Sequence, residues 1–381
     1  MGPVTRRGFD AARCIVVKVG SSLLQSGPSV IDAIADDIAS LAGQGKRIVL
    51  VSSGAVALGR PRLGLGSGSL TLEQKQAAAA AGQPVLVGEW ERTFARHGRA
   101  TAQALLTLDV TESRRHWLNA RATLHTLLDL GAIPVVNEND TIATDEIRYG
   151  DNDRLAARVA QLVGADLLVL LSDIEGLFDR DPRCHPEARL VPEVHRIDAS
   201  IHAMAGDANK LTGVGTGGMR SKILAAEIAA ASGCATIIGS GSARTPILRL
   251  RQTGCGSWFH PTGSAVSARA AWIAGAHSPN GEIRIDAGAA SALQAGKSLL
   301  PVGAIAVDGH FERGDAVRII GPDGTAIARG VSGYDASDAR RICGCKTAEI
   351  EALLGYRRAS ALVHADDIVL SSPGANGGCN V

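Results

Sequence analysis

The chain has 381 residues, 45% of them hydrophobic, which is the composition of a globular protein rather than a disordered one. At roughly 150 residues per domain, this length predicts two or three domains. The chain carries 39 Lys and Arg against 38 Asp and Glu. The resulting net charge of +1 excludes a nucleic-acid binder driven by overall charge.

The cysteines and the apolar runs indicate the compartment. The 7 cysteines are an odd number without metal-binding spacing, so we expect reduced thiols rather than disulfides. The N-terminal residues lack the apolar core of a secretory signal, and no uncharged apolar run reaches about 18 residues. The sequence therefore predicts a cytoplasmic protein that does not enter a membrane.

Four short apolar runs predict buried strands, and each run ends in small or polar residues. The runs are 14–19, 48–51, 132–136 and 167–171. They are continuous rather than alternating, which is typical of parallel strands that are buried on both faces.

Helical patterns lie between these strands, at residues 30–43, 113–130, 155–162 and 223–231. The alternation predicts an α/β fold, with a doubly wound, mainly parallel sheet sandwiched by helices. Ligands of such sheets bind beyond the carboxyl ends of the strands. We therefore expect the polar residues that follow the strands to converge at one edge of the sheet.

The pattern changes near residue 260. Short alternating segments and a Gly-Pro-Asp-Gly turn at 321–324 predict a small β-rich second domain with one or two short helices. The expected boundaries are a catalytic domain at 1–262, a linker at 263–279, the β-rich domain at 280–370 and a disordered tail at 371–381.

Two lysines follow glycine-containing turns that can hold phosphate. Lys18 ends the first strand, just before Gly-Ser-Ser, and Lys222 lies in the first turn of the helix that follows the glycine-rich run 213–218. Backbone N–H groups and a helix N-terminus favour an anion at both places. A strand-end lysine alone is more often a solvated charge, whereas glycines that lead into a lysine-bearing helix are more specific.

Carboxylates and amides cluster at two strand–helix junctions, in the runs Asn-Glu-Asn-Asp at 137–140 and Gly-Asp-Asn-Asp at 150–153. Helix capping explains one of these groups but not all of them. Such a cluster can bind an ammonium group, orient lysines or take Mg²⁺ through phosphate. Ser53, in the run Ser-Ser-Gly-Ala, can hold a substrate carboxylate or simply cap a helix. The histidines, His195 among them, form no usable spacing, and we assign no metal-ligating residue.

Taken in order, these motifs resemble the amino acid kinase family and, within it, the kinases that phosphorylate the γ-carboxylate of glutamate. The runs that carry the resemblance are Val-Lys-Val-Gly-Ser-Ser, Ser-Ser-Gly-Ala, Pro-Val-Val-Asn-Glu-Asn-Asp, Gly-Asp-Asn-Asp and Gly-Thr-Gly-Gly-Met-Arg-Ser-Lys. The C-terminal region, with Lys-Ser-Leu-Leu-Pro at 297–301, is similar to a PUA domain. The resemblance implies the amino acid kinase fold and ATP-dependent formation of L-glutamyl 5-phosphate, the first step of proline biosynthesis.

The resemblance also implies a role for each matching residue. Lys18 and Lys222 would flank the transferred phosphoryl group, with Asp153 orienting both lysines. L-Glutamate would be bound by Ser53, Asp140 and Asn152. The nucleotide would be contacted by Lys18, Ser172, Asp173, Thr216, Gly217, Gly218, Met219, Arg220, Ser221 and Lys222.

The implied cofactors are ATP and Mg²⁺, and the implied partners are L-glutamate, a homo-oligomer (dimer or tetramer) and proline as feedback inhibitor. Two alternatives stay open. One is a kinase of another small acid, such as acetylglutamate or aspartate. The other is RNA binding through the C-terminal domain, where arginines such as Arg318 and Arg341 are interleaved with acidic residues.

Overall fold

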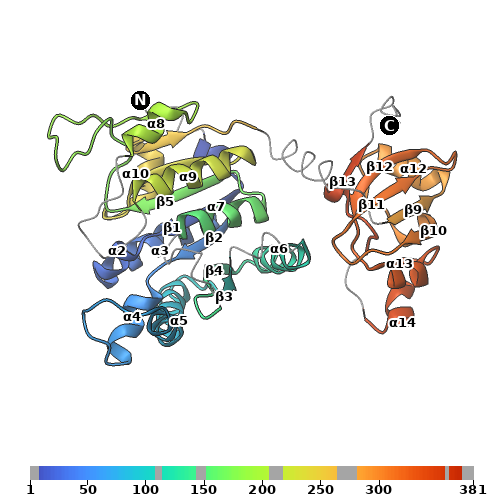
Figure 1. Ribbon diagram of the computed structural model, residues 1–381, viewed down its shortest axis with the longest axis horizontal. Helices are drawn as coiled ribbons and strands as arrows, with labels where there is room; N and C mark the ends of the chain where they lie inside the picture. The colour runs from blue at the N-terminus through green and yellow to red at the C-terminus, as the bar shows by residue number, and fades with distance from the viewer. Residues whose placement is uncertain are drawn as a thin grey trace. The chain divides into compact units, whose positions relative to one another are not determined.

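The computed structural model describes residues 8–107, 114–142, 152–205, 218–263, 281–356 and 360–370. The chain divides into two compact units, Met1–Ala265 and Val266–Val381 (Figure 1). The predicted tail at 371–381, and all of the predicted linker except residue 263, lie outside the described residues.

A single mainly parallel sheet forms the centre of the first unit. Its strands are β1 (Cys14–Val19), β2 (Arg47–Ser52), β3 (Thr101–Leu106), β4 (Ile133–Glu138), β5 (Leu167–Ser172), β6 (Glu193–Val194), β7 (Ala235–Ser240) and β8 (Ser257–Phe259). Their order across the sheet is β3-β4-β2-β1-β5-β7-β8-β6. Strands β3, β4, β2, β1, β5 and β7, which are neighbours in this order, are parallel to one another. Strand β8 is antiparallel to β7, and β6 is parallel to β8. The central strands therefore end at the same edge.

Helices cover both faces of this sheet. They are α2 (Ser21–Gln25), α3 (Pro28–Gly43), α4 (Ala55–Arg62), α5 (Leu72–Ala95), α6 (Arg114–Asp129), α7 (Asn152–Val163), α8 (Ala199–Met204), α9 (Met219–Ala231) and α10 (Pro246–Thr253). One hydrophobic core joins the sheet to α3, α5 and α10, and a second joins its other face to α6, α7 and α9. The predicted doubly wound α/β architecture is confirmed.

Alternation along β1 decides which side chain enters which core. Val17 and Val19 lie in the core of α3, α5 and α10, whereas Val16 lies in the core of α7 and α9. Lys18 follows the same alternation as Val16, because successive side chains of a strand point to opposite faces. Its side chain is thus directed toward α7 and α9.

Several elements that were not predicted from the sequence carry weak local signals, although the missed strand β7 is buried and largely apolar. β3 is an edge strand whose side chains are only partly buried, so it lacks a continuous apolar run. Helices α4 and α5 contain Pro61 and Pro84, residues that normally interrupt a helix.

Among the described helices, none is both long and apolar enough to cross a membrane.

The second unit is built on a five-stranded sheet, in the order β10-β9-β11-β12-β13. Its strands are β9 (Gly281–Ile285), β10 (Ala304–Gly309), β11 (Ala316–Ile320), β12 (Ala326–Val331) and β13 (Ile368–Leu370). Its helices are α12 (Ala287–Gln294), α13 (Ala336–Ile342) and α14 (Ile350–Leu354), with 3₁₀ turns η2 (Pro301–Gly303), η3 (Thr347–Glu349) and η4 (Ala365–Asp367). The predicted β-rich domain is confirmed, but its described part has three short α-helices where we expected one or two.

Helices α4 and α5 approach so closely that their backbones touch. A Cβ added at Gly59 would lie 1.7 Å from the carbonyl oxygen of Ala78, and one at Gly82 would lie 1.8 Å from that of Ala55. Helix α4 begins directly after Gly54, whose φ of 104° favours glycine. This crossing therefore holds the chain that leaves β2, where the predicted substrate residue Ser53 lies.

We expect Gly82→Ala to lower the free energy of unfolding by at least about 2 kcal/mol, because the added methyl group overpacks the crossing. The matched control is Gly88→Ala in the same helix, where nothing lies within 4 Å of the added Cβ. That change should stabilise the protein by about 0.5–1 kcal/mol, through helix propensity alone. Urea unfolding of both variants measures the contrast, and equal midpoints would contradict the close contact.

Candidate active site

Three charged side chains meet at the carboxyl edge of the sheet. Lys18 lies in β1, Asp153 in the first turn of α7, and Lys222 in the first turn of α9. The Nζ atom of Lys18 lies 2.6 Å from Oδ1 of Asp153, and Nζ of Lys222 lies 3.2 Å from Oδ2. The hydroxyl of Ser221 donates a hydrogen bond to the same Oδ2 at 2.7 Å. Residues far apart in the sequence thus form one cluster.

All three charges of this cluster are buried, with 4%, 1% and 5% of Lys18, Asp153 and Lys222 exposed. Burial by itself would raise the pKa of Asp153. The charges of Lys18 and Lys222, with the hydrogen bonds from Lys18 and Ser221, outweigh that effect and hold the pKa well below its usual range. The carboxylate therefore stays ionised, and the three side chains together carry one net positive charge.

A second, uncharged network lies beside this cluster. The side-chain N–H groups of Asn152 donate to the hydroxyl of Ser53 at 2.8 Å and to Oδ1 of Asn137 at 3.0 Å. Asn152 therefore connects the ends of β2 and β4 with the start of α7. Its own Oδ1 is buried and has no hydrogen-bond partner among the described residues.

The third predicted substrate residue, Asp140, follows the end of β4 and is buried. Burial raises the pKa of Asp140 to about 6. A carboxyl group in this state is partly protonated just below neutral pH, and a cationic ligand would favour its ionised form.

The predicted nucleotide residues fall in two places. Ser172 ends β5, next to β1, and its hydroxyl donates to Oδ1 of the exposed Asp173 at 2.9 Å. Gly218 precedes α9, whose first turn holds Met219, Arg220, Ser221 and Lys222. Thr216 and Gly217 lie outside the described residues.

Two features leave room for an anion near the lysines. Gly218 is the N-cap residue of α9 and supplies no side-chain cap, so the helix N-terminus keeps backbone N–H groups for a ligand. At Gly20, an added Cβ would lie 3.9 Å from Nζ of Lys18 and 3.6 Å from the carbonyl oxygen of Leu171. The glycine thus leaves open a position beside the amine that any other residue would fill. These residues fit a phosphate group.

Asn137 belongs to a polar run that the sequence shows, but its role in this network was not predicted, and neither were the contacts that support Ser53. The indole N–H of Trp90 in α5 donates to the hydroxyl of Ser52 at 2.9 Å, and Ser52 is fully buried. The amide of Gln83, also in α5, donates to the carbonyl oxygen of Glu138 at 3.4 Å. An isolated buried Trp or Gln in a helix carries no local signal for such a role.

Comparison with known proteins assigns both units. A profile of the amino acid kinase family matches residues 13–240, and a PUA domain profile matches residues 281–354. A glutamate 5-kinase from Caulobacter vibrioides (strain NA1000 / CB15N) is 53% identical over 369 residues, which cover 95% of this chain and 98% of the relative. Glutamate 5-kinase 1 from Rhizobium meliloti (strain 1021) is 52% identical over 373 residues, covering 97% and 94%.

Solved structures give more distant similarities. A carbamate kinase from Giardia lamblia bound to AMP-PNP is 18% identical, with a TM-score of 0.47, and the match covers 66% of this chain and 99% of that protein. A UMP kinase from Ureaplasma parvum is 11% identical, with a TM-score of 0.44, and the match covers 65% and 98%.

We expect Asp153→Asn to lower the free energy of unfolding by about 3 kcal/mol or more near neutral pH, because it leaves two buried ammonium groups without their carboxylate. The folded pKa of Asp153 is depressed, so this contribution is present above the unfolded pKa of about 3.9 and is lost as the pH falls below it. Urea unfolding at several pH values measures this effect. The difference in the free energy of unfolding between wild type and variant should become smaller as the pH falls from neutral to acidic.

The matched control is Asp36→Asn. Asp36 is 57% exposed and pairs with His97 at 2.8 Å, so its loss should cost at most about 1 kcal/mol. If Asp153→Asn and Asp36→Asn lowered the free energy of unfolding by the same small amount, burial of the two lysines beside Asp153 would not make its charge important for stability.

Proposed function

The chain belongs to the amino acid kinase family, and we propose that it transfers the γ-phosphoryl group of ATP to the γ-carboxylate of L-glutamate. The observation that carries the proposal is the convergence of Lys18 and Lys222 on one buried carboxylate at the carboxyl edge of the sheet. The names and the coverage of the glutamate 5-kinase relatives support glutamate as the acceptor.

The chemistry needs positioning and charge neutralisation more than proton transfer. The γ-carboxylate is already a nucleophile at neutral pH, so its oxygen attacks the γ-phosphorus while the bond to the bridging oxygen of ADP breaks. Negative charge develops on the transferred group, and the amines of Lys18 and Lys222 stabilise that charge from two directions. Asp153 acts as a positioning residue, since it holds both amines through its two oxygens.

Glutamate is held by residues that follow β2 and β4 and by the first residue of α7. The unpartnered Oδ1 of Asn152 can accept a hydrogen bond from the substrate ammonium group, and the ionised Asp140 provides the opposite charge. The hydroxyl of Ser53, held by Asn152, can donate to the α-carboxylate.

Mg²⁺ would accompany ATP and would be held mainly through phosphate oxygens and water, a usual mode for this ion. Both oxygens of Asp153, the buried carboxylate beside the lysines, already contact ammonium groups, so we assign this residue no role as a Mg²⁺ ligand.

A homo-oligomer, inhibition by proline, a cytoplasmic location and the domain boundaries given above stay predictions.

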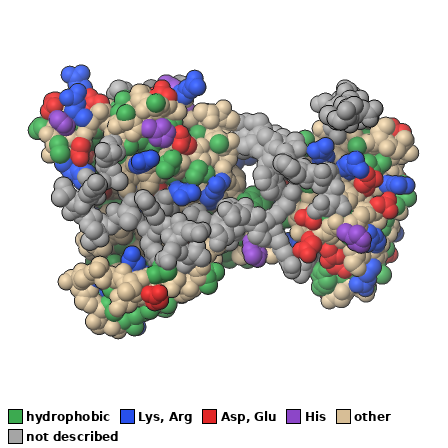
Figure 2. All heavy atoms as spheres, viewed as in Figure 1, with side chains coloured by type: hydrophobic (Ala, Val, Ile, Leu, Met, Phe, Trp, Pro, Cys, Tyr) green, Lys and Arg blue, Asp and Glu red, His purple; other side chains and the backbone are tan. Residues whose placement is uncertain are grey.

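RNA binding by the second unit is less well supported. On the face shown in Figure 2, basic and acidic side chains intermingle over this unit rather than forming a basic patch. Its ion pairs include Arg284–Asp308, Arg318–Glu282 and Arg341–Asp338. Partial neutralisation of these arginines weakens the electrostatic attraction that phosphate binding needs.

The acceptor is tested by measuring ADP release from ATP with glutamate, aspartate, acetylglutamate and uridylate in parallel. We expect turnover with glutamate and none with acetylglutamate or uridylate, which lack the free α-ammonium group that the carboxylate of this site would bind. Aspartate has both α-groups but a shorter side chain, so turnover with aspartate in place of glutamate would overturn glutamate as the acceptor. Turnover with acetylglutamate or uridylate in place of glutamate would overturn the assignment.

We expect Lys18→Met and Lys222→Met each to lower kcat by about 10² or more, since each removes one charge that stabilises the transition state. The control is Lys297→Met, which removes an exposed lysine of the second unit and should leave kcat unchanged. Near-normal turnover in both active-site variants would refute the two-lysine mechanism.

The raised pKa of Asp140 predicts a pH dependence for glutamate use. Below about pH 6 the free enzyme carries protonated Asp140, which no longer attracts an ammonium group, so kcat/KM for glutamate should fall about tenfold per pH unit. Asp140→Asn should have a low kcat/KM without this inflection, whereas Asp36→Asn should retain it. A wild-type profile that is flat through pH 6 would exclude Asp140 as the ammonium ligand.

A further inference from the structure

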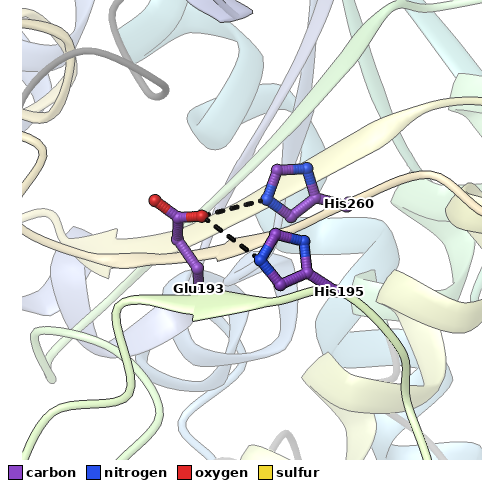
Figure 3. A group of neighbouring side chains, drawn as sticks. All are labelled: Glu193, His195 and His260. Atoms are coloured by element: carbon purple, nitrogen blue, oxygen red, sulfur yellow. Dashed lines mark hydrogen bonds and ion pairs between the residues drawn. The ribbon is translucent and has the colours of Figure 1, made fainter.

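A cluster of candidate metal ligands lies at the edge of the sheet opposite the edge strand β3. Glu193 belongs to β6, the edge strand, His195 follows that strand, and His260 follows β8. The three ligand atoms all lie within 4.8 Å of one another (Figure 3). The carboxylate oxygen Oε2 of Glu193 lies 3.3 Å from Nε2 of His260 and 3.6 Å from Nε2 of His195.

Strand register brings these side chains together. Glu193 pairs with Trp258 and Val194 with Phe259, so the next positions along the two parallel strands are His195 and His260. The backbone N–H of His260 donates to the carbonyl oxygen of Val194 at 2.9 Å. Because side chains two apart on a strand share a face, Glu193 and His195 point to the same side.

Two of the ligands are already held in place. Glu193 and His260 have side chains that are 35% and 25% exposed, and the buried Trp258 packs edge-on against the His260 ring at 6.4 Å. The His195 side chain is 75% exposed, and its ring stacks on that of His260 at 4.3 Å and 17°. An ion binds in the plane of an imidazole, so the two parallel rings cannot share one ion until His195 turns, which its exposure allows.

We propose that Glu193, His195 and His260 bind one divalent transition-metal ion of the Zn²⁺ class. Two imidazoles and one carboxylate are a ligand set that Zn²⁺ takes, whereas Mg²⁺ prefers oxygen ligands. With metal–ligand bonds of about 2.0–2.2 Å, tetrahedral ligand atoms lie about 3.3 Å apart. The separation of 3.3 Å between Oε2 of Glu193 and Nε2 of His260 matches this value. Water would complete the coordination.

The ion would link two strands of the sheet and would take no part in phosphoryl transfer. It joins β6, two residues long, to β8, three residues long, at the sheet edge. In the sheet order β6 is four positions from β1, which at about 4.8 Å per strand is roughly 19 Å from the strand that carries Lys18. Binding to the folded state alone raises stability by mass action.

The test uses the full chain after chelator treatment, titrated with Co²⁺ for its visible d–d absorption and with Zn²⁺ by calorimetry. We expect one ion per chain, with the intensity of a four-coordinate Co²⁺ site, and a rise in the unfolding midpoint on adding Zn²⁺. His260→Ala and Glu193→Gln should each weaken binding at least about tenfold and abolish the rise in midpoint. Activity with Mg²⁺ and ATP should stay at the wild-type level in both variants.

The matched control is His202→Ala, which removes a histidine paired with a single carboxylate, Glu227, at 2.9 Å. This variant should bind Co²⁺ and Zn²⁺ as the wild type does. Binding that is absent in the wild type, or equal in the wild type and His260→Ala, would overturn the proposal and leave the cluster as a side-chain contact between the edge strand β6 and the end of β8.

Discussion

The rest of the active site depends on one buried carboxylate shared by two lysines. Asp153 is almost fully buried, and each of its oxygens faces one ammonium group. Removing such charges from water is costly, so the arrangement is stable only while β1, α7 and α9 all stay in place. The cluster therefore forms only where the fold brings these three elements together, and Asp153 contacts both lysines there.

The direction of the strands determines where this cluster forms. Parallel strands end at the same edge, so the residues after β1, β2, β4 and β5 lie along one edge of the sheet although they are far apart in the chain. Helices α7 and α9 start at this edge and bring Asp153 and Lys222 with their first turns. The N-terminus of α9 adds a dipole that favours an anion at the same place as the lysine charges.

The remaining parts of the first unit keep this edge in shape. On one side, the crossing of α4 and α5 brings two backbones into contact, and Trp90 of α5 holds Ser52 at the end of β2. At the far edge, β6 and β8 are only two and three residues long, and the contact between Glu193 and His260 adds a side-chain link to their backbone pairing. The sheet is thus supported by side-chain contacts at places where its backbone pairing is short or its helices touch.

The sequence by itself determined the fold class, the positions of four buried strands along the chain and the residues at their ends, because continuous apolar runs, glycine turns and helix periods are local signals. It placed Lys18 at a strand end and Lys222 in a helix start, and the resemblance to a known family supplied the role of Asp153. Only the tertiary structure showed that both lysines face one carboxylate, that Asn152 links Ser53 to Asn137, and that His195 and His260 lie in register. These contacts depend on strand order and register between segments up to about two hundred residues apart, which no local pattern of residues encodes.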